Sequence, residues 1–111
     1  MALAALSPQA AIAHAMLLQA SPAVGSTASV PPTQLELHFS EGVEPSFTSV
    51  EVADSNGGRY DATGLHTASG DAATLLVPLR QLGADTYTVI WHATSVDTHK
   101  TQGHFSFSVA P

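Results

Sequence analysis

The sequence predicts an all-β protein, a sandwich or a barrel of short strands. After residue 14, short apolar runs alternate with clusters of turn residues at intervals of about eight to twelve positions. No apolar period of about 3.6 residues lasts long enough to predict a helix. The chain of 111 residues has the size of one domain and is too short for two separate cores.

The composition excludes several classes of protein. Hydrophobic residues make up 44% of the chain and charged residues 11%, which is apolar enough to build a core and excludes intrinsic disorder. The net charge of -6 repels phosphate backbones, so nucleic acid is not an expected partner. The sequence has no cysteine, which excludes disulfides, thiolate metal sites and cysteine nucleophiles.

The N-terminal segment has the character of a leader. Residues 1–13 are mostly Ala and Leu and end in Ala11-Ile12-Ala13, which fits the small-x-small pattern of signal peptidase sites. We interpret residues 1–13 as the remnant of a signal peptide and residues 14–111 as the folded domain, although an Ala-rich leader of a cytoplasmic protein is the alternative. The segment is far shorter than the roughly 20 apolar residues that span a bilayer, so we expect no membrane insertion.

The first two strands are predicted on either side of a proline-rich loop. Residues 15–18 form a short apolar strand that ends before Pro22, since proline cannot donate to a ladder. In residues 35–39 apolar and polar side chains alternate, which places them on opposite faces of a strand. His38 is therefore expected to point outward.

A hairpin is predicted next. Val50 and Val52 continue the alternation, and a turn over residues 54–58 ends this strand. Asn-Gly within the turn adopts positive φ at little cost. We expect the chain to return in a strand toward Arg59-Tyr60.

The last three strands carry the clearest core pattern. Residues 74–77 form a strand that ends at Pro78, and residues 87–91 alternate so that their aromatic and branched side chains share one face. Residues 105–109 alternate in the same way, with His104 and the serines on the outer face. These strands are expected to supply most of the core.

A candidate metal site lies between the last two strands. Six histidines are many for a chain of this length, and imidazole suits copper, zinc and nickel. The polar loop 95–100 contains Asp97 and His99, which would share a face in an extended segment and could offer one oxygen and one nitrogen to an ion. An ordinary surface loop with incidental polar residues is the alternative interpretation.

A third ligand residue is available if residues 1–13 are removed. His14 would then be the N-terminal residue, and its α-amine and imidazole can chelate one ion in a six-membered ring. With Asp97 and His99 the site would have three nitrogens and one oxygen, a set that favours Cu(II). The nitrogens must be deprotonated to bind, so binding should weaken as the pH falls.

These residues resemble the CopC and PcoC family of periplasmic copper-resistance proteins. The resemblance runs from His14 to the end of the chain and is carried by four segments with specific motifs: Ser21-Pro22-Ala23, Phe39-Ser40-Glu41-Gly42-Val43-Glu44, Ser95-Val96-Asp97-Thr98-His99-Lys100 and Gly103 to Phe107.

The resemblance implies an immunoglobulin-like Greek-key β-sandwich of about seven short strands. It also implies a monomer that binds Cu(II) in the periplasm and buffers it or passes it to a CopD-type inner-membrane importer, without catalysis. It implies His14, Asp97 and His99 as ligands, and Glu41 as an outer-shell or occasional ligand, although an acidic residue at a strand end is an equal alternative. Some relatives bind Cu(I) with several methionines. Met16 is the only methionine after the leader, so a Cu(I) site is not expected.

The sequence assigns none of the other histidines as a direct ligand. His92 and His104 are interpreted as solvated surface residues, with a place beside the metal site as the alternative, and His66 as a residue of the loop 64–70 without an evident partner. His38 remains a weak outer-shell candidate because it is close to Glu41 in the sequence.

Two other functions compete with a carrier. A copper monooxygenase also uses an N-terminal histidine, but it needs exposed aromatic side chains and open coordination positions. Aromatic residues make up only 6% of this chain and mostly follow the core alternation, and Asp97 would occupy coordination space. An immunoglobulin-like adhesion module would leave the pairing of Asp97 with His99 unexplained.

Overall fold

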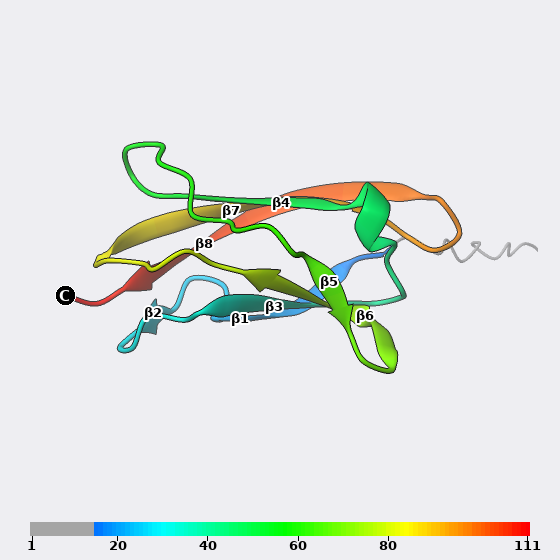
Figure 1. The fold of residues 1–111 in the computed structure, drawn as a ribbon, viewed down its shortest axis with the longest axis horizontal. Helices are drawn as coiled ribbons and strands as arrows, with labels where there is room; N and C mark the ends of the chain where they lie inside the picture. Colours follow the sequence, from blue (N-terminus) through cyan, green and yellow to red (C-terminus); the bar gives the residue numbers. More distant parts are fainter. Residues whose placement is uncertain (1–14) are drawn as a thin grey trace, which may run out of the picture.

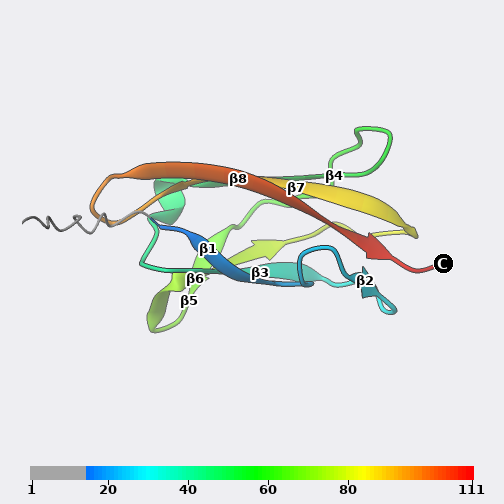
Figure 2. The same cartoon turned by 180° about the vertical axis from the view of Figure 1, so that it is seen from behind.

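The computed structural model describes residues 15–111, which form two four-stranded sheets packed face to face (Figures 1 and 2). The predicted all-β sandwich is confirmed. The strands are β1 (Leu17–Ser21), β2 (Thr27–Ala28), β3 (Gln34–Phe39), β4 (Ser49–Ala53), β5 (His66–Ala68), β6 (Asp71–Pro78), β7 (Asp85–Thr94) and β8 (Lys100–Val109).

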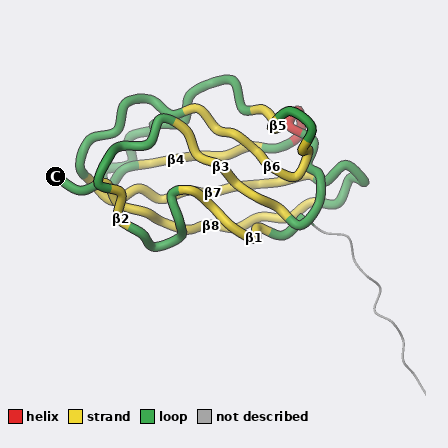
Figure 3. Tube along the Cα trace, turned by 90° about the horizontal axis from the view of Figure 1, so that it is seen from below, coloured by secondary structure: helices red, strands yellow, loops and turns green. Residues whose placement is uncertain are grey.

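Each sheet combines strands that are distant in the sequence. One sheet has the order β1-β3-β6-β5 and the other the order β2-β8-β7-β4. All neighbouring strands are antiparallel except β2, which pairs parallel to β8. The one helical element of the described chain is a 3-10 turn, η1 (Pro45–Phe47), drawn red in Figure 3. No helix within residues 15–111 has the length and apolarity needed to cross a membrane.

The predicted inner faces of the strands are buried. The β7–β8 ladder runs without a break from Asp85↔Val109 to Thr94↔Lys100, so the side-chain alternation is in phase along both strands. The buried apolar side chains come from both sheets, as the sequence predicted for most of them: Leu35, Leu37, Phe39, Val50, Val52, Leu75, Val77, Tyr87, Val89, Trp91, Phe105, Phe107 and Val109.

A glycine is required where the side chain of Trp91 lies against the neighbouring strand β8. Gly103 pairs with Trp91, and a Cβ on Gly103 would lie 2.6 Å from Cζ2 of the indole. On its other side the indole meets Phe39 of the opposite sheet edge-on, with ring centroids 5.3 Å apart. Trp91 therefore joins the two sheets through the space that Gly103 leaves open.

The structure differs from the predicted strands in three places. It has eight strands, because β2 and β5 are added and the predicted strand at residues 59–60 is lost. Both added strands are too short to show an alternation. The first strand begins at Leu17 and not at residue 15. The predicted hairpin at residues 59–60 is reduced to a single bridge, Ala53↔Arg59, because the Asp61 carboxylate accepts the hydrogen bond of the Val52 amide at 3.0 Å, in place of a ladder carbonyl.

Candidate metal centre

The loop 95–99 connects β7 to β8 at the end of the sandwich opposite the C-terminus (orange in Figure 1). The predicted loop is a tight turn and not an extended segment. The Thr98 amide donates to the Ser95 carbonyl at 2.8 Å, and the Ser95 amide donates to the His99 carbonyl at 2.8 Å. Thr98 has a φ of 74°, because the chain must reverse direction between two antiparallel strands.

This turn nevertheless brings Asp97 and His99 together. The Nδ1 atom of His99 lies 3.3 Å from Oδ1 of Asp97, and 54% and 43% of these side chains are exposed. A hydrogen bond from Ser95 holds the pKa of Asp97 below its usual value, and the nearby His99 lowers it further. Asp97 is therefore a carboxylate at neutral pH, and a carboxylate oxygen and an imidazole nitrogen lie side by side at the surface.

The described chain begins beside this loop. Ala15 is fully buried, and its carbonyl accepts a hydrogen bond of 2.8 Å from Oγ1 of Thr101 at the start of β8. The next residue, Met16, is held on the other side, where its amide donates to Oγ of Ser40 at 2.9 Å. The blue start of the chain and the orange loop consequently share one end of the sandwich (Figures 1 and 2). The predicted ligand His14 lies outside the described residues.

Glu41 lies in the segment that borders the loop from the opposite sheet. It is half-buried and follows β3 in a bend. The carbonyl of the next residue, Gly42, accepts a hydrogen bond of 3.0 Å from the Val96 amide, and Val43 forms a bridge with Ser95. The backbone at Glu41 is thus tied to the loop that carries Asp97.

Comparison with known proteins identifies the family of this domain. A family model described as the CopC domain matches residues 17–110. The chain belongs to the CopC family.

Three relatives illustrate this membership. Protein YobA of Escherichia coli strain K12 is 39% identical over 98 residues, which cover 87% of this chain and 79% of that protein. The copper transport protein CutJ of Bacillus subtilis strain 168 is 33% identical over 103 residues, which cover 92% of this chain and 19% of that protein. The crystal structure of CopC from Methylosinus trichosporium OB3b superposes with a TM-score of 0.82 at 28% identity and covers 88% of this chain and 95% of that one.

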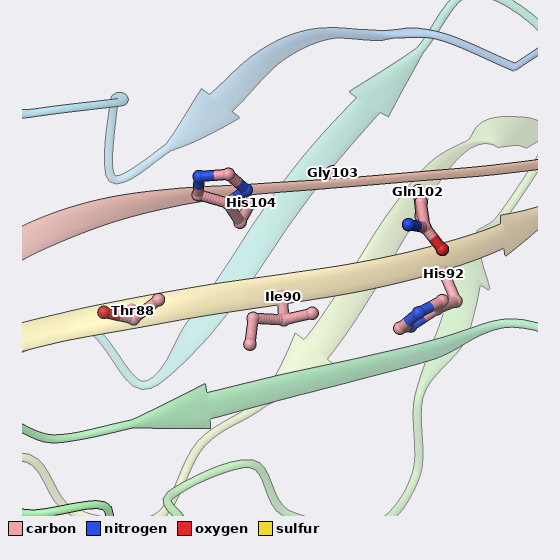
Figure 4. Close-up of a pocket in the computed structure, with 6 residues that line it drawn as sticks. All are labelled: Thr88, Ile90, His92, Gln102, Gly103 and His104. Carbon is pink, nitrogen blue, oxygen red and sulfur yellow. The ribbon is translucent and has the colours of Figure 1, made fainter.

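Two other histidines of this CopC-family chain line a shallow hollow on the outer face of the β7–β8 sheet (Figure 4). His92 and His104 are exposed there, as predicted, and lie toward opposite ends of the hollow. The hollow has a volume of about 610 Å³, and its other lining residues are Thr88, Ile90, Gln102 and Gly103. None of the lining residues is an Asp, Glu, Lys or Arg.

The remaining histidines have partners away from the loop. His66 lies in β5 and not in a loop, and its Nδ1 is 2.7 Å from the Gly64 carbonyl, a partner that the sequence did not show. His38 points outward from β3 as predicted, and it contacts Glu36 and Thr74 on the same face of the sheet.

The CopC-family domain supplies two candidate ligand side chains at the loop. Within residues 15–111, no three His, Asp or Glu side chains are arranged so that they could hold a metal ion. Asp97 and His99 are thus a pair of possible donors and not a complete site within these residues. The chemistry of this pair fits a borderline metal such as Cu(II), which accepts nitrogen and oxygen donors.

Proposed function

We propose that this chain binds one Cu(II) ion through His14, Asp97 and His99 after removal of residues 1–13, and that it buffers or carries copper in the periplasm. The observation that carries the proposal is the position of the Asp97–His99 pair. It lies at the end of the sandwich where Thr101 holds the chain at Ala15, the residue that follows His14.

The choice of Cu(II) follows from the donor set. An α-amine, two imidazoles and a carboxylate give three nitrogens and one oxygen, which suit the tetragonal geometry of Cu(II). At a given site of this kind Cu(II) binds more tightly than Zn(II). Thioether ligands would select Cu(I), and Met16 is the single methionine of the proposed mature chain.

Glu41 has a supporting role in this proposal. The next residue, Gly42, is hydrogen-bonded to Val96, which ties the backbone at Glu41 to the metal loop. We assign Glu41 as a group beside the ligands or as an occasional ligand. The variant Glu41→Gln should therefore weaken copper binding less than the loss of Asp97 does.

The exposure of the ligands favours a carrier. About half of each of the Asp97 and His99 side chains is exposed, so the ligands of an acceptor protein can reach the metal. We propose a CopD-type inner-membrane importer as that acceptor and a monomeric carrier. The segment of CutJ that matches this chain makes up only 19% of that protein, which is named a copper transport protein. This supports the proposal that a CopC-type domain works beside a transport unit.

Catalysis is less consistent with this surface. Phe47, at 71%, is the one aromatic residue of residues 15–111 that is largely exposed, so the chain offers few aromatic side chains to a substrate. Asp97 would also supply an anionic ligand where oxygen activation needs an open coordination position. We therefore assign a carrier and not a monooxygenase.

Native mass spectrometry tests the proposal directly. Periplasmic protein should begin at His14 and should retain one copper ion after addition of one equivalent of Cu(II). Electron paramagnetic resonance of the same sample should show coupling to nitrogen ligands. A mature chain that retains no copper, or that binds it without nitrogen coupling, would rule out the proposed site.

A further inference from the structure

A buried hydroxyl group lies beneath the candidate metal loop. Ser95 is 1% exposed, whereas Val96 beside it is 60% exposed and the side chains of Asp97 and His99 are about half exposed. Ser95 is one of three buried polar residues in the described chain, with Thr74 and Thr94. A polar group at such a position is expected to have hydrogen-bond partners.

The partners of this hydroxyl are the two residues that carry the candidate ligands. Oγ of Ser95 donates a short hydrogen bond to Oδ1 of Asp97, because an ionised carboxylate can only accept. The same oxygen accepts a hydrogen bond of 3.1 Å from the backbone amide of His99. One hydroxyl therefore orients the Asp97 carboxylate and fixes the backbone from which the His99 imidazole projects.

Ser95 is itself held by the backbone on both sides. Its amide donates to the His99 carbonyl at 2.8 Å, its carbonyl accepts from the Thr98 amide at 2.8 Å, and it forms a bridge with Val43. Val43 in turn donates to the Ala72 carbonyl of β6 at 2.9 Å, so Ser95 is linked to the opposite sheet as well as to the end of β7. The hydroxyl is thus fixed with respect to the core, although the ligands that it orients lie at the surface.

We propose that Ser95 is a positioning residue of the copper site, which arranges Asp97 and His99 for metal binding before the ion arrives. This inference rests on the proposed function. Hydrogen bonds from outer groups to metal ligands fix the orientation of those ligands, and their loss lowers metal affinity about 10- to 100-fold. A ligand pair that is already ordered also loses less conformational freedom on binding.

The test compares Ser95→Ala with a matched control, Thr94→Val. Thr94 is the adjacent buried hydroxyl residue, but its Oγ1 donates to the Phe47 carbonyl at 2.8 Å. Copper affinity is measured by chelator competition on mature protein, and melting curves confirm that each variant is folded. We expect about a 10- to 100-fold loss of affinity for Ser95→Ala and unchanged affinity for Thr94→Val.

A double-mutant cycle separates positioning from general damage. In a background of Asp97→Ala, the further change Ser95→Ala should cost clearly less affinity than it does in wild type, because the group that Ser95 orients is gone. Equal losses in both backgrounds would overturn the positioning of Asp97 by Ser95. The signature in copper electron paramagnetic resonance should also change for Ser95→Ala and stay constant for Thr94→Val.

Hydrogen exchange of the metal-free wild type provides a test that needs neither a variant nor copper. The His99 amide should exchange slowly even without copper, because Ser95 accepts its hydrogen bond. Exchange as fast as in an unprotected loop would overturn the proposal. If wild type retains no copper, the proposed function fails together with this role. If wild type binds copper and Ser95→Ala binds it equally well, only the role of Ser95 fails.

Discussion

Two histidine–carboxylate pairs in this domain have the same spacing but different surroundings. Glu36 and His38 lie two residues apart on β3, and Asp97 and His99 lie two residues apart in the loop between β7 and β8. In each pair an imidazole nitrogen lies 3.3 Å from a carboxylate oxygen. Both pairs are also partly exposed, with side-chain exposures between 38% and 54%.

The pair on β3 is embedded in a regular sheet. His38 pairs with Thr74 of β6, and its Nδ1 lies 3.0 Å from Oγ1 of that residue. Thr74 in turn donates to Oδ2 of Asp71 at 2.6 Å. These contacts connect two neighbouring strands on the outer face of a sheet.

The loop pair lies where the chain enters the domain. Its supporting hydroxyl belongs to Ser95 of the same turn, and Ala15 is held nearby by Thr101. Because the same contact occurs in both pairs, a close histidine and carboxylate do not by themselves indicate a metal site. We infer that the access of a third nitrogen donor, from His14, distinguishes the loop pair from the pair on β3.

The largest expected effect comes from the N-terminal leader. In a chain that begins at Met1 the nitrogen of His14 is an amide and cannot act as a basic ligand, so the chelate ring is lost. We expect copper affinity to be lower by several orders of magnitude than for a chain that begins at His14. Competition titrations of both chains in one buffer measure the difference. Equal affinities would show that the amine is not a ligand, and the distinction between the two pairs would lose its basis.

Substitutions in the two pairs should have opposite outcomes. His99→Ala and Asp97→Ala each remove a proposed ligand and should weaken Cu(II) binding more than about 100-fold, beyond the loss typical of an outer-shell residue. His38→Ala is the matched control and should leave the affinity unchanged, as should His66→Ala. Isothermal competition against a copper chelator measures all four variants. If His38→Ala lost as much affinity as His99→Ala, the assignment of the metal to the loop pair alone would be wrong.

Copper should stabilise the domain through the loop pair. A ligand that binds only the native state adds about 4 kcal/mol at a free concentration 1,000 times its Kd, so Cu(II) should raise the melting temperature clearly. Zn(II) should raise it less. The shift should shrink in His99→Ala and persist in His38→Ala. A zinc shift as large as the copper shift would contradict the inferred tetragonal site.

The smallest expected effect is on stability in acid, and it concerns one aspartate near each of the two pairs. A hydroxyl donor lowers the pKa of Asp97 through Ser95 and the pKa of Asp71 through Thr74. The unfolded chain, with an Asp pKa of about 3.9, binds these protons more readily than the folded chain. Each carboxylate therefore stabilises the metal-free fold above this pH and loses that contribution as the pH falls through its lower folded value.

Acid unfolding of Asp97→Asn and Asp71→Asn measures this contribution. Each variant should show a slightly weaker dependence of stability on pH below about 4 than wild type. Because both side chains are near solvent, we expect small and similar changes. A much larger change for either one would indicate that its region is more tightly coupled to the fold than the contacts suggest.

The sequence was sufficient for the fold class and for most of the core. The alternation in residues 35–39, 87–91 and 105–109 correctly assigned the inner and outer faces of these strands. Alternation is a local property, because successive side chains of a strand point to opposite faces wherever the strand lies. The loop motif also pointed to Asp97 and His99, whose contact the structure confirms.

Tertiary structure decided the features that depend on residues far apart in the chain. The carboxylate of Asp61 took the place of a ladder carbonyl at Val52, and Thr101 met Ala15 across 86 positions of the sequence. The reversal between β7 and β8 made the predicted loop a tight turn and buried Ser95 beneath it. Such contacts require both sheets to be in place, so no local pattern of residues could show that one hydroxyl would orient both candidate ligands.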